Sequence, residues 1–91
     1  MIRLVEVQQR MSSFRLTEVY VNPEHVVAIR EDERMVQILR EGKLPDNLDE
    51  RQSFTKIYID RGHTGIDMTV IGDVRQIKEK LGLNKRTLLK G

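Results

Sequence analysis

Hydrophobic and polar residues alternate along several short stretches of the chain. In the second of these, Thr17, Val19 and Val21 fall on one side of the chain. The other side carries Leu16, Glu18 and Tyr20. A period of two is typical of a strand that buries one face. The pattern predicts five strands, at about residues 1–7, 15–21, 25–30, 54–60 and 66–71.

The period changes after the third predicted strand. Met35, Ile38 and Leu39 are spaced i, i+3, i+4, and a glycine follows where a helix commonly ends. This spacing predicts a short helix at about residues 31–41. A strand over residues 34–39 is the alternative, because the same residues could extend the preceding sheet.

A second helix is predicted at residues 73–81. Asp73 is a favourable N-cap residue, and Gln76 stands three positions later, as in a capping box. An apolar stripe begins at Val74 with the spacing i, i+3, i+7, and Gly82 stands where the helix should stop.

The remaining segments are predicted to be the turns and loops that connect these strands and helices. Residues 8–13 are polar and unpatterned, and are interpreted as a long hairpin loop; the Asn22-Pro23 pair predicts a turn; and the polar residues 42–53 predict a long exposed loop. Because these connections are too short for parallel crossovers, we expect a mainly β fold. It would be a strongly bent five-stranded antiparallel sheet or small barrel, with a helical insertion after the third strand and a C-terminal helix.

Composition narrows the class of protein. Ninety-one residues support a single domain over residues 1–91, and the absence of cysteine excludes disulfides, thiolate metal ligands and a cysteine nucleophile. The longest apolar run is four residues, against the roughly 20 that span a bilayer. We therefore expect a soluble cytoplasmic protein with no membrane role. A small core with open sheet edges also favours a homo-oligomer.

Charge is distributed unevenly along the chain. The net charge is +2, but residues 1–73 carry −3 and residues 74–91 carry +5. The basic residues of the 83–91 tail are Lys85, Arg86 and Lys90. A solvated helix face with a frayed tail is the commoner explanation of such an asymmetry, and attraction to an anionic partner is the alternative.

Catalytic patterns are nearly absent from the sequence. His25 and His63 lie 38 residues apart without a third ligand at a useful spacing, so no metal site is predicted. The serines lack the glycines of a nucleophile elbow, and the glycine turn at residues 62–65 is too short for a phosphate-binding loop. The sequence thus predicts a protein that is not an enzyme and has no cofactor.

Two turns carry residues suited to nucleic acid. The first offers Asn22 and His25, and the second offers Arg61, Gly62 and His63. In a bent sheet these turns can lie at the same end. Amide, imidazole and guanidinium groups there could bind and stack on the bases of single-stranded RNA. Asn-Pro and Arg-Gly-His are also ordinary turn sequences, which is the structural alternative.

Five strands with a loop after the second and the Arg61-Gly62 turn between the fourth and fifth resemble the Sm/LSm-type small β-barrels. The resemblance implies a ring that forms when strand four of one subunit pairs with strand five of the next. It also implies uridine-rich single-stranded RNA at the pore, bound by Asn22, His25, Arg61 and Gly62. The chemistry of the second turn adds His63 to these RNA-binding residues. Lys85, Arg86 and Lys90 would add attraction for phosphate.

The segments 20–29 and 70–81 are similar to the short flagellar FlbD/SwrD-type proteins and to small hypothetical proteins of tailed phages. The sequence thus leaves two functional hypotheses. The first is an oligomeric RNA-binding protein, and the second is a protein-interaction module of the same fold. In the second, the sheet edges or the 42–53 loop would bind protein.

Overall fold

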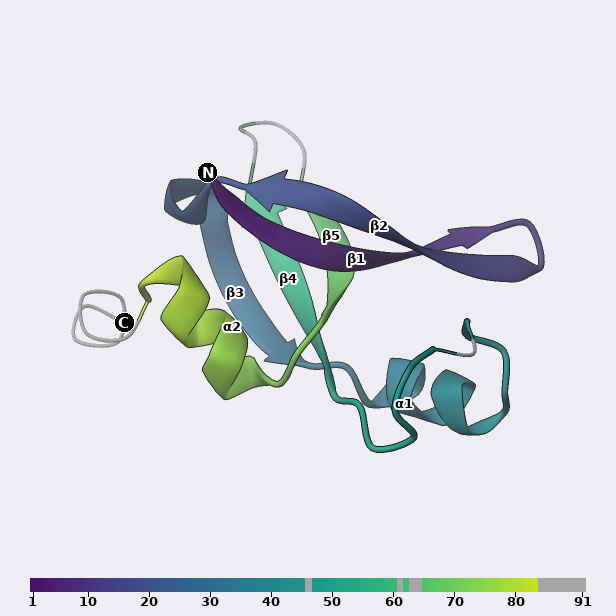
Figure 1. Cartoon of the computed structure of the whole chain (residues 1–91). Helices are drawn as coiled ribbons and strands as arrows, with labels where there is room; N and C mark the ends of the chain where they lie inside the picture. The colour runs from purple at the N-terminus through teal and green to yellow at the C-terminus, as the bar shows by residue number, and fades with distance from the viewer. Residues whose placement is uncertain (46, 61, 63–64, 84–91) are drawn as a thin grey trace.

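The computed structural model describes residues 1–45, 47–60, 62 and 65–83 (Figure 1). The elements in chain order are β1 (Ile2–Arg10), β2 (Ser13–Val21), the 3₁₀ turn η1 (Pro23–His25), β3 (Val26–Glu31), α1 (Glu33–Arg40), β4 (Phe54–Asp60), β5 (Gly65–Ile71) and α2 (Val74–Leu81). Several predicted RNA-binding residues lie outside the described residues, namely Arg61, His63, Lys85, Arg86 and Lys90.

The five strands form one antiparallel sheet in the order β2-β1-β5-β4-β3. A mainly β fold with a five-stranded antiparallel sheet and two helices is therefore confirmed, but the sheet does not close into a barrel. Strands β2 and β3 follow one another in the chain, joined by Asn22 and η1, yet they form opposite edges of the sheet. Strand β4 is paired with β3 on one side and β5 on the other, so it has no edge for the pairing that an Sm-type ring requires.

The β1–β2 hairpin crosses the rest of the sheet. Strand β1 pairs with β2 along its whole length, but with β5 only at Glu6–Val70 and Val7–Thr69. Alternate residues of a strand face opposite sides. The two halves of the hairpin therefore use opposite faces, and each half packs in a different core.

The larger core lies between the sheet and α2. Its buried residues are Leu4, Val21, Ile57, Ile59, Val70, Ile77 and Leu81. The smaller core lies on the other face, where α1 packs under the far half of the hairpin (Figure 1). Its buried residues are Val7, Met35, Ile38, Leu44 and Phe54. The 3.6-residue period at Met35 and Ile38 thus marks a helix in the structure, at Glu33–Arg40.

One predicted loop was wrong, and a second is a loop that is less exposed than predicted. The polar residues 8–13 continue the hairpin up to the pair Arg10–Ser13, which leaves a two-residue turn at Met11 and Ser12. Backbone pairing holds these residues in strands although their side chains have no hydrophobic alternation. The 42–53 connection is not wholly exposed, because Leu44 is only 6% exposed and fills the smaller core.

Asp32 joins α1 to the sheet. Its backbone N–H donates to the Phe54 carbonyl at 2.9 Å, and its carboxylate accepts from the Met35 N–H and the Thr69 hydroxyl. It therefore caps α1 and connects it to β4 and β5 at a buried position. Among the described residues, no helix is long and apolar enough to cross a membrane.

Replacing Asp32 with alanine should cost about 3 kcal/mol, since the change removes a helix cap and leaves a buried hydroxyl without its acceptor. Asp73 is the matched control: it caps α2 through the Gln76 N–H, but at an exposed site. Asp73→Ala should cost about 1 kcal/mol. Urea unfolding measures both, and equal losses would contradict the role assigned to Asp32.

Candidate binding groove

A groove of about 600 Å³ opens at the end of the sheet where the β2–β3 and β4–β5 connections meet. It is built from the chain start, β2, η1, β4 and β5. Its wall is formed by Met1, Val19, Tyr20, Val21, Asn22, His25, Ile59, Ile66 and Met68.

The pairing of three strands brings these residues together. Val26 at the start of β3 is opposite Ile59 near the end of β4, and Ile59 is opposite Ile66 near the start of β5. The two connections therefore lie at the same end of the sheet, as the sequence analysis expected. Because β2 does not pair with β3, the larger core is open here and its apolar side chains form the groove wall.

Asn22 and His25 both line the groove; Asn22 is the N-cap of the turn η1, and His25 is its last residue. The Asn22 side-chain oxygen accepts from the Glu24 N–H at 3.0 Å, and the His25 N–H donates to the Asn22 carbonyl at 3.0 Å. The amide oxygen thus caps the turn, which leaves the amide NH₂ as the group that can donate to a ligand. The His25 side chain is exposed.

The β4–β5 turn begins directly beyond the groove wall. Asp60 follows Ile59, and its carboxylate accepts from the Gly62 N–H at 2.9 Å. Gly62 is exposed and has a φ of +85°, a conformation that favours glycine. Arg61 and His63 lie outside the described residues, so the structure brings Asn22 and His25 together and leaves the remaining members of the predicted site as predictions.

The pattern of the sequence did not predict the exposed hydrophobic residues of the groove. Tyr20 is 59% exposed, Met1 82% and Ile66 41%. An aromatic residue on the polar side of β2 was the available signal for Tyr20. The sequence contains no such signal for Ile66, because Ile66, Met68 and Val70 alternate as the residues of a buried strand face do.

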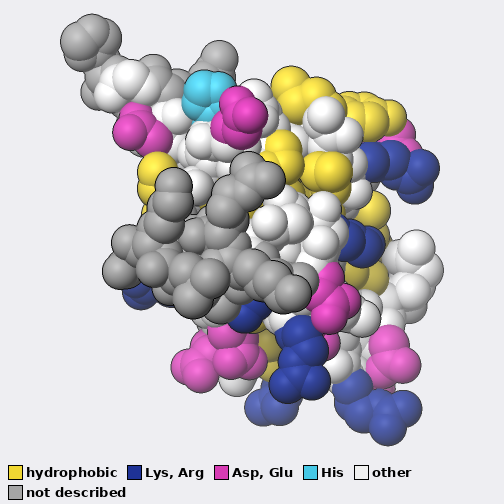
Figure 2. Space-filling model, turned by 90° about the vertical axis from the view of Figure 1, so that its left-hand side faces the viewer, with side chains coloured by type: hydrophobic (Ala, Val, Ile, Leu, Met, Phe, Trp, Pro, Cys, Tyr) yellow, Lys and Arg dark blue, Asp and Glu magenta, His cyan; other side chains and the backbone are white. Residues whose placement is uncertain are grey.

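The charge of the groove is acidic at its margin. Neither lysine nor arginine occurs among the described residues that line it. Glu24 and Asp60 are exposed and adjoin wall residues in the chain, whereas Asp67 alternates with Ile66 and Met68 and faces the other side of the sheet. Figure 2 shows hydrophobic side chains at the upper part of the surface, close to acidic side chains and a histidine, with a lysine or arginine side chain beside them at the right.

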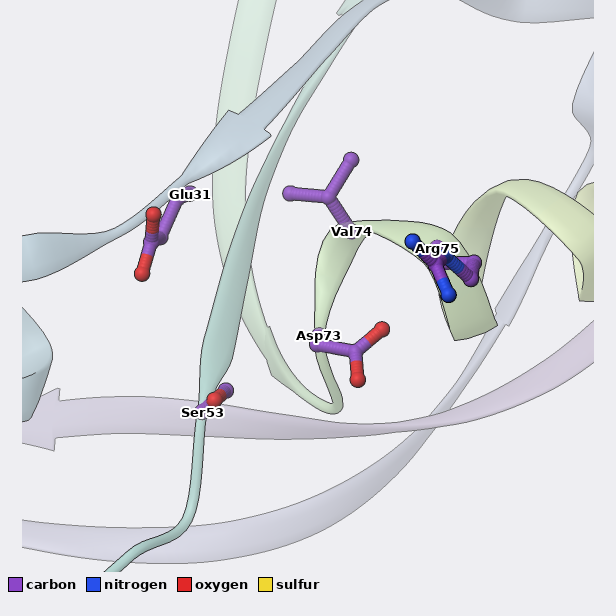
Figure 3. Close-up of a pocket in the computed structure, with 5 residues that line it drawn as sticks. All are labelled: Glu31, Ser53, Asp73, Val74 and Arg75. Atoms are coloured by element: carbon purple, nitrogen blue, oxygen red, sulfur yellow. The ribbon is translucent and has the colours of Figure 1, made fainter.

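A smaller hollow of about 310 Å³ lies where β3 ends and α2 begins (Figure 3). It is lined by Glu31, Ser53, Asp73, Val74 and Arg75. The Glu31 and Asp73 carboxylates point away from one another in Figure 3, and Asp73 is occupied by capping α2. In the described part of the chain, no three histidine or carboxylate residues are grouped as a metal site would require. The groove is therefore the stronger candidate.

The chain was compared with protein family models, curated proteins and solved structures, and it matches none of them.

Proposed function

We propose that this protein is an interaction module that binds an extended, apolar segment of a partner protein. The segment would add to the edge of the sheet at β2 and place side chains in the groove. The observation that carries the proposal is that an apolar groove lies at the end of a regular nine-residue edge strand.

Strand β2 is the better of the two edges for strand addition. Strand β3 has six residues and a register shift between Val26 and Ala28, and such bulges disfavour pairing with a new strand. Strand β2 pairs with β1 through nine consecutive positions, without a shift. Within the described residues, its second edge has no partner strand.

Charged residues commonly protect an edge strand, but those of β2 are engaged with β1. Arg15 donates to the Gln8 side-chain oxygen at 3.3 and 3.4 Å, and Glu18 forms an ion pair with Arg3 at 2.9 Å. Both interactions direct the charged groups toward the neighbouring strand. The backbone N–H and C=O groups on the outer edge of β2 are therefore not shielded by charged side chains.

The groove gives the added strand its specificity. In strand addition, backbone hydrogen bonds supply affinity and pockets for alternate side chains supply selectivity. Val19, Ile59 and Met68 favour aliphatic or aromatic side chains on the core face of the sheet. Tyr20 alternates with Val19 and Val21, so it would be an aromatic anchor for the side chains that the added strand places on the other face. The acidic margin favours a segment with basic residues on either side of its apolar centre.

The test is a selection of nine-residue peptides from a random library, with binding measured on the full chain. We expect selected peptides to have apolar residues at alternate positions and basic flanks. The double variant Tyr20→Ala, Ile66→Ser should weaken their binding tenfold or more, as for a loss of about 1.4 kcal/mol or more. N-methylation of alternate peptide amides should have a similar effect, because it removes donors to β2.

Val27→Ser is the matched control, since Val27 is a hydrophobic residue 63% exposed on the other edge strand. It should leave peptide binding unchanged. A peptide with the sequence of β2 itself belongs in the set: its binding would identify a second copy of the chain as the partner, in line with the expected homo-oligomer. Failure to select any peptide, or equal losses in Val27→Ser, would contradict the proposal.

Single-stranded RNA is a second candidate for the same groove. The observation in its favour is that Asn22 and His25 line the groove together with Tyr20. Bases can stack on tyrosine and histidine and bond to an amide. Cations for the phosphates would have to come from Arg61 and the basic tail, because the described wall has none. For that reason a protein ligand is the first proposal.

A titration with an oligouridine probe at two salt concentrations tests the RNA candidate. Arg61→Ala should weaken binding by about an order of magnitude, consistent with roughly 1–3 kcal/mol for a good contact. Higher salt should weaken it further, because phosphate contacts release counterions. Absence of binding by the unaltered protein at low salt would remove RNA from consideration.

A further inference from the structure

The far end of the β1–β2 hairpin projects beyond the rest of the sheet (Figure 1). We define the hairpin tip as residues 8–15. It contains two arginines, two glutamines and two serines, and no acidic residue. In a chain with 14 acidic residues, this gives a local positive surface that the small net charge conceals.

Met11 lies at the extreme end of the tip. It is 99% exposed, and its φ of +56° makes it the only non-glycine residue with positive φ in the part of the chain that the structure describes. A two-residue hairpin turn usually uses asparagine or glycine there. Such a conformation is unfavourable for methionine, and strained backbone of this kind is concentrated at functional sites.

Side chains fix the shape of the tip. The Gln9 side-chain amide donates to the Met11 carbonyl at 3.4 Å, and the Ser13 hydroxyl donates to the Arg10 carbonyl at 3.2 Å. At the base of the tip, Phe14 and Leu16 pack against the smaller core. The hairpin is therefore anchored on α1 while its end extends outward.

We propose that this tip binds the minor groove of double-stranded DNA, with Met11 as an apolar wedge between base steps. Arg10 and Arg15 would contact the phosphates, with Arg15 exchanging its hydrogen bonds to Gln8 for the phosphate. The Gln9 side-chain oxygen and the Ser12 hydroxyl, which the hydrogen bonds within the tip do not use, would bond to base edges. Minor-groove proteins combine arginine, glutamine and a protruding apolar residue in this way. The proposal is independent of the groove at the other end of β2.

The composition of the tip favours DNA over other anionic partners. Glutamine and serine are suited to hydrogen bonds with base edges. Binding to a lipid surface would require more apolar residues than the tip contains. Duplex RNA has a deep, narrow major groove that protein side chains cannot read and a shallow minor groove, so a narrow ribbon fits it poorly. A minor-groove site predicts a preference for A·T-rich sequence.

The experiment is a fluorescence titration of the full chain with A·T-rich and G·C-rich 20-base-pair duplexes. With two phosphate contacts, affinity should fall about tenfold between 50 and 200 mM salt. The double variant Arg10→Gln, Arg15→Gln should bind about tenfold more weakly at low salt and lose most of the salt dependence. Arg40→Gln, Arg75→Gln is the matched control, because it removes the same charge from exposed positions on the two helices.

The variant Met11→Gly distinguishes the contribution of the Met11 side chain to DNA binding from its effect on the stability of the fold. Glycine accepts the positive φ, so the urea midpoint should stay the same or rise. Duplex affinity and DNA bending, measured by energy transfer between the duplex ends, should both fall. Tyr20→Ala, Ile66→Ser should leave duplex binding unchanged, which keeps this outcome separate from that of the groove.

Three results would overturn the proposal. The first is no binding to either duplex at 50 mM salt. The second is an equal loss in the control arginine variant, which would show general charge attraction. The third is tip variants that weaken binding to anionic phosphatidylserine vesicles but leave duplex binding intact, which would assign the tip to a membrane surface.

Discussion

The short contact between β1 and β5 determines the arrangement of the whole molecule. Within the described residues, the β1–β2 hairpin pairs with the three-stranded part of the sheet only at Glu6–Val70 and Val7–Thr69. The hairpin therefore crosses the sheet instead of lying flat beside β5. One half of it covers the larger core, and the other half packs on α1 from the opposite face. The free edge of β2, the groove and the projecting tip all result from this crossing.

Two buried polar sites hold the helices against opposite faces of the sheet. Asp32 connects α1 to β4 and β5. Gly72 sets the direction of the chain into α2: its φ is +127°, its N–H donates to Ser53, and its carbonyl accepts from the buried Thr55 hydroxyl. A β-carbon there would lie 3.0 Å from the Ile77 side chain. Both helices thus depend on close backbone contacts as well as on hydrophobic burial.

The sequence predicted the local elements better than their pairing. Period-two and period-3.6 patterns identified the strands and helices, since each element buries one face. The strand order could not be read in the same way, because Val7 and Leu4 face different cores although both belong to one strand. For the groove, Asn22 and His25 were found by their chemistry. Tyr20 and Ile66 were missed because their exposure depends on a sheet that stays open.

The central claim is that β2 is an open edge that accepts a further strand. Amide hydrogen exchange followed residue by residue along Ser13–Val21 tests it most directly. The account predicts that amides bonded to β1 exchange slowly, that the alternate amides exchange quickly, and that a selected peptide slows the second set. Slow exchange of every β2 amide in the free protein, or peptide-induced protection confined to β3, would contradict it.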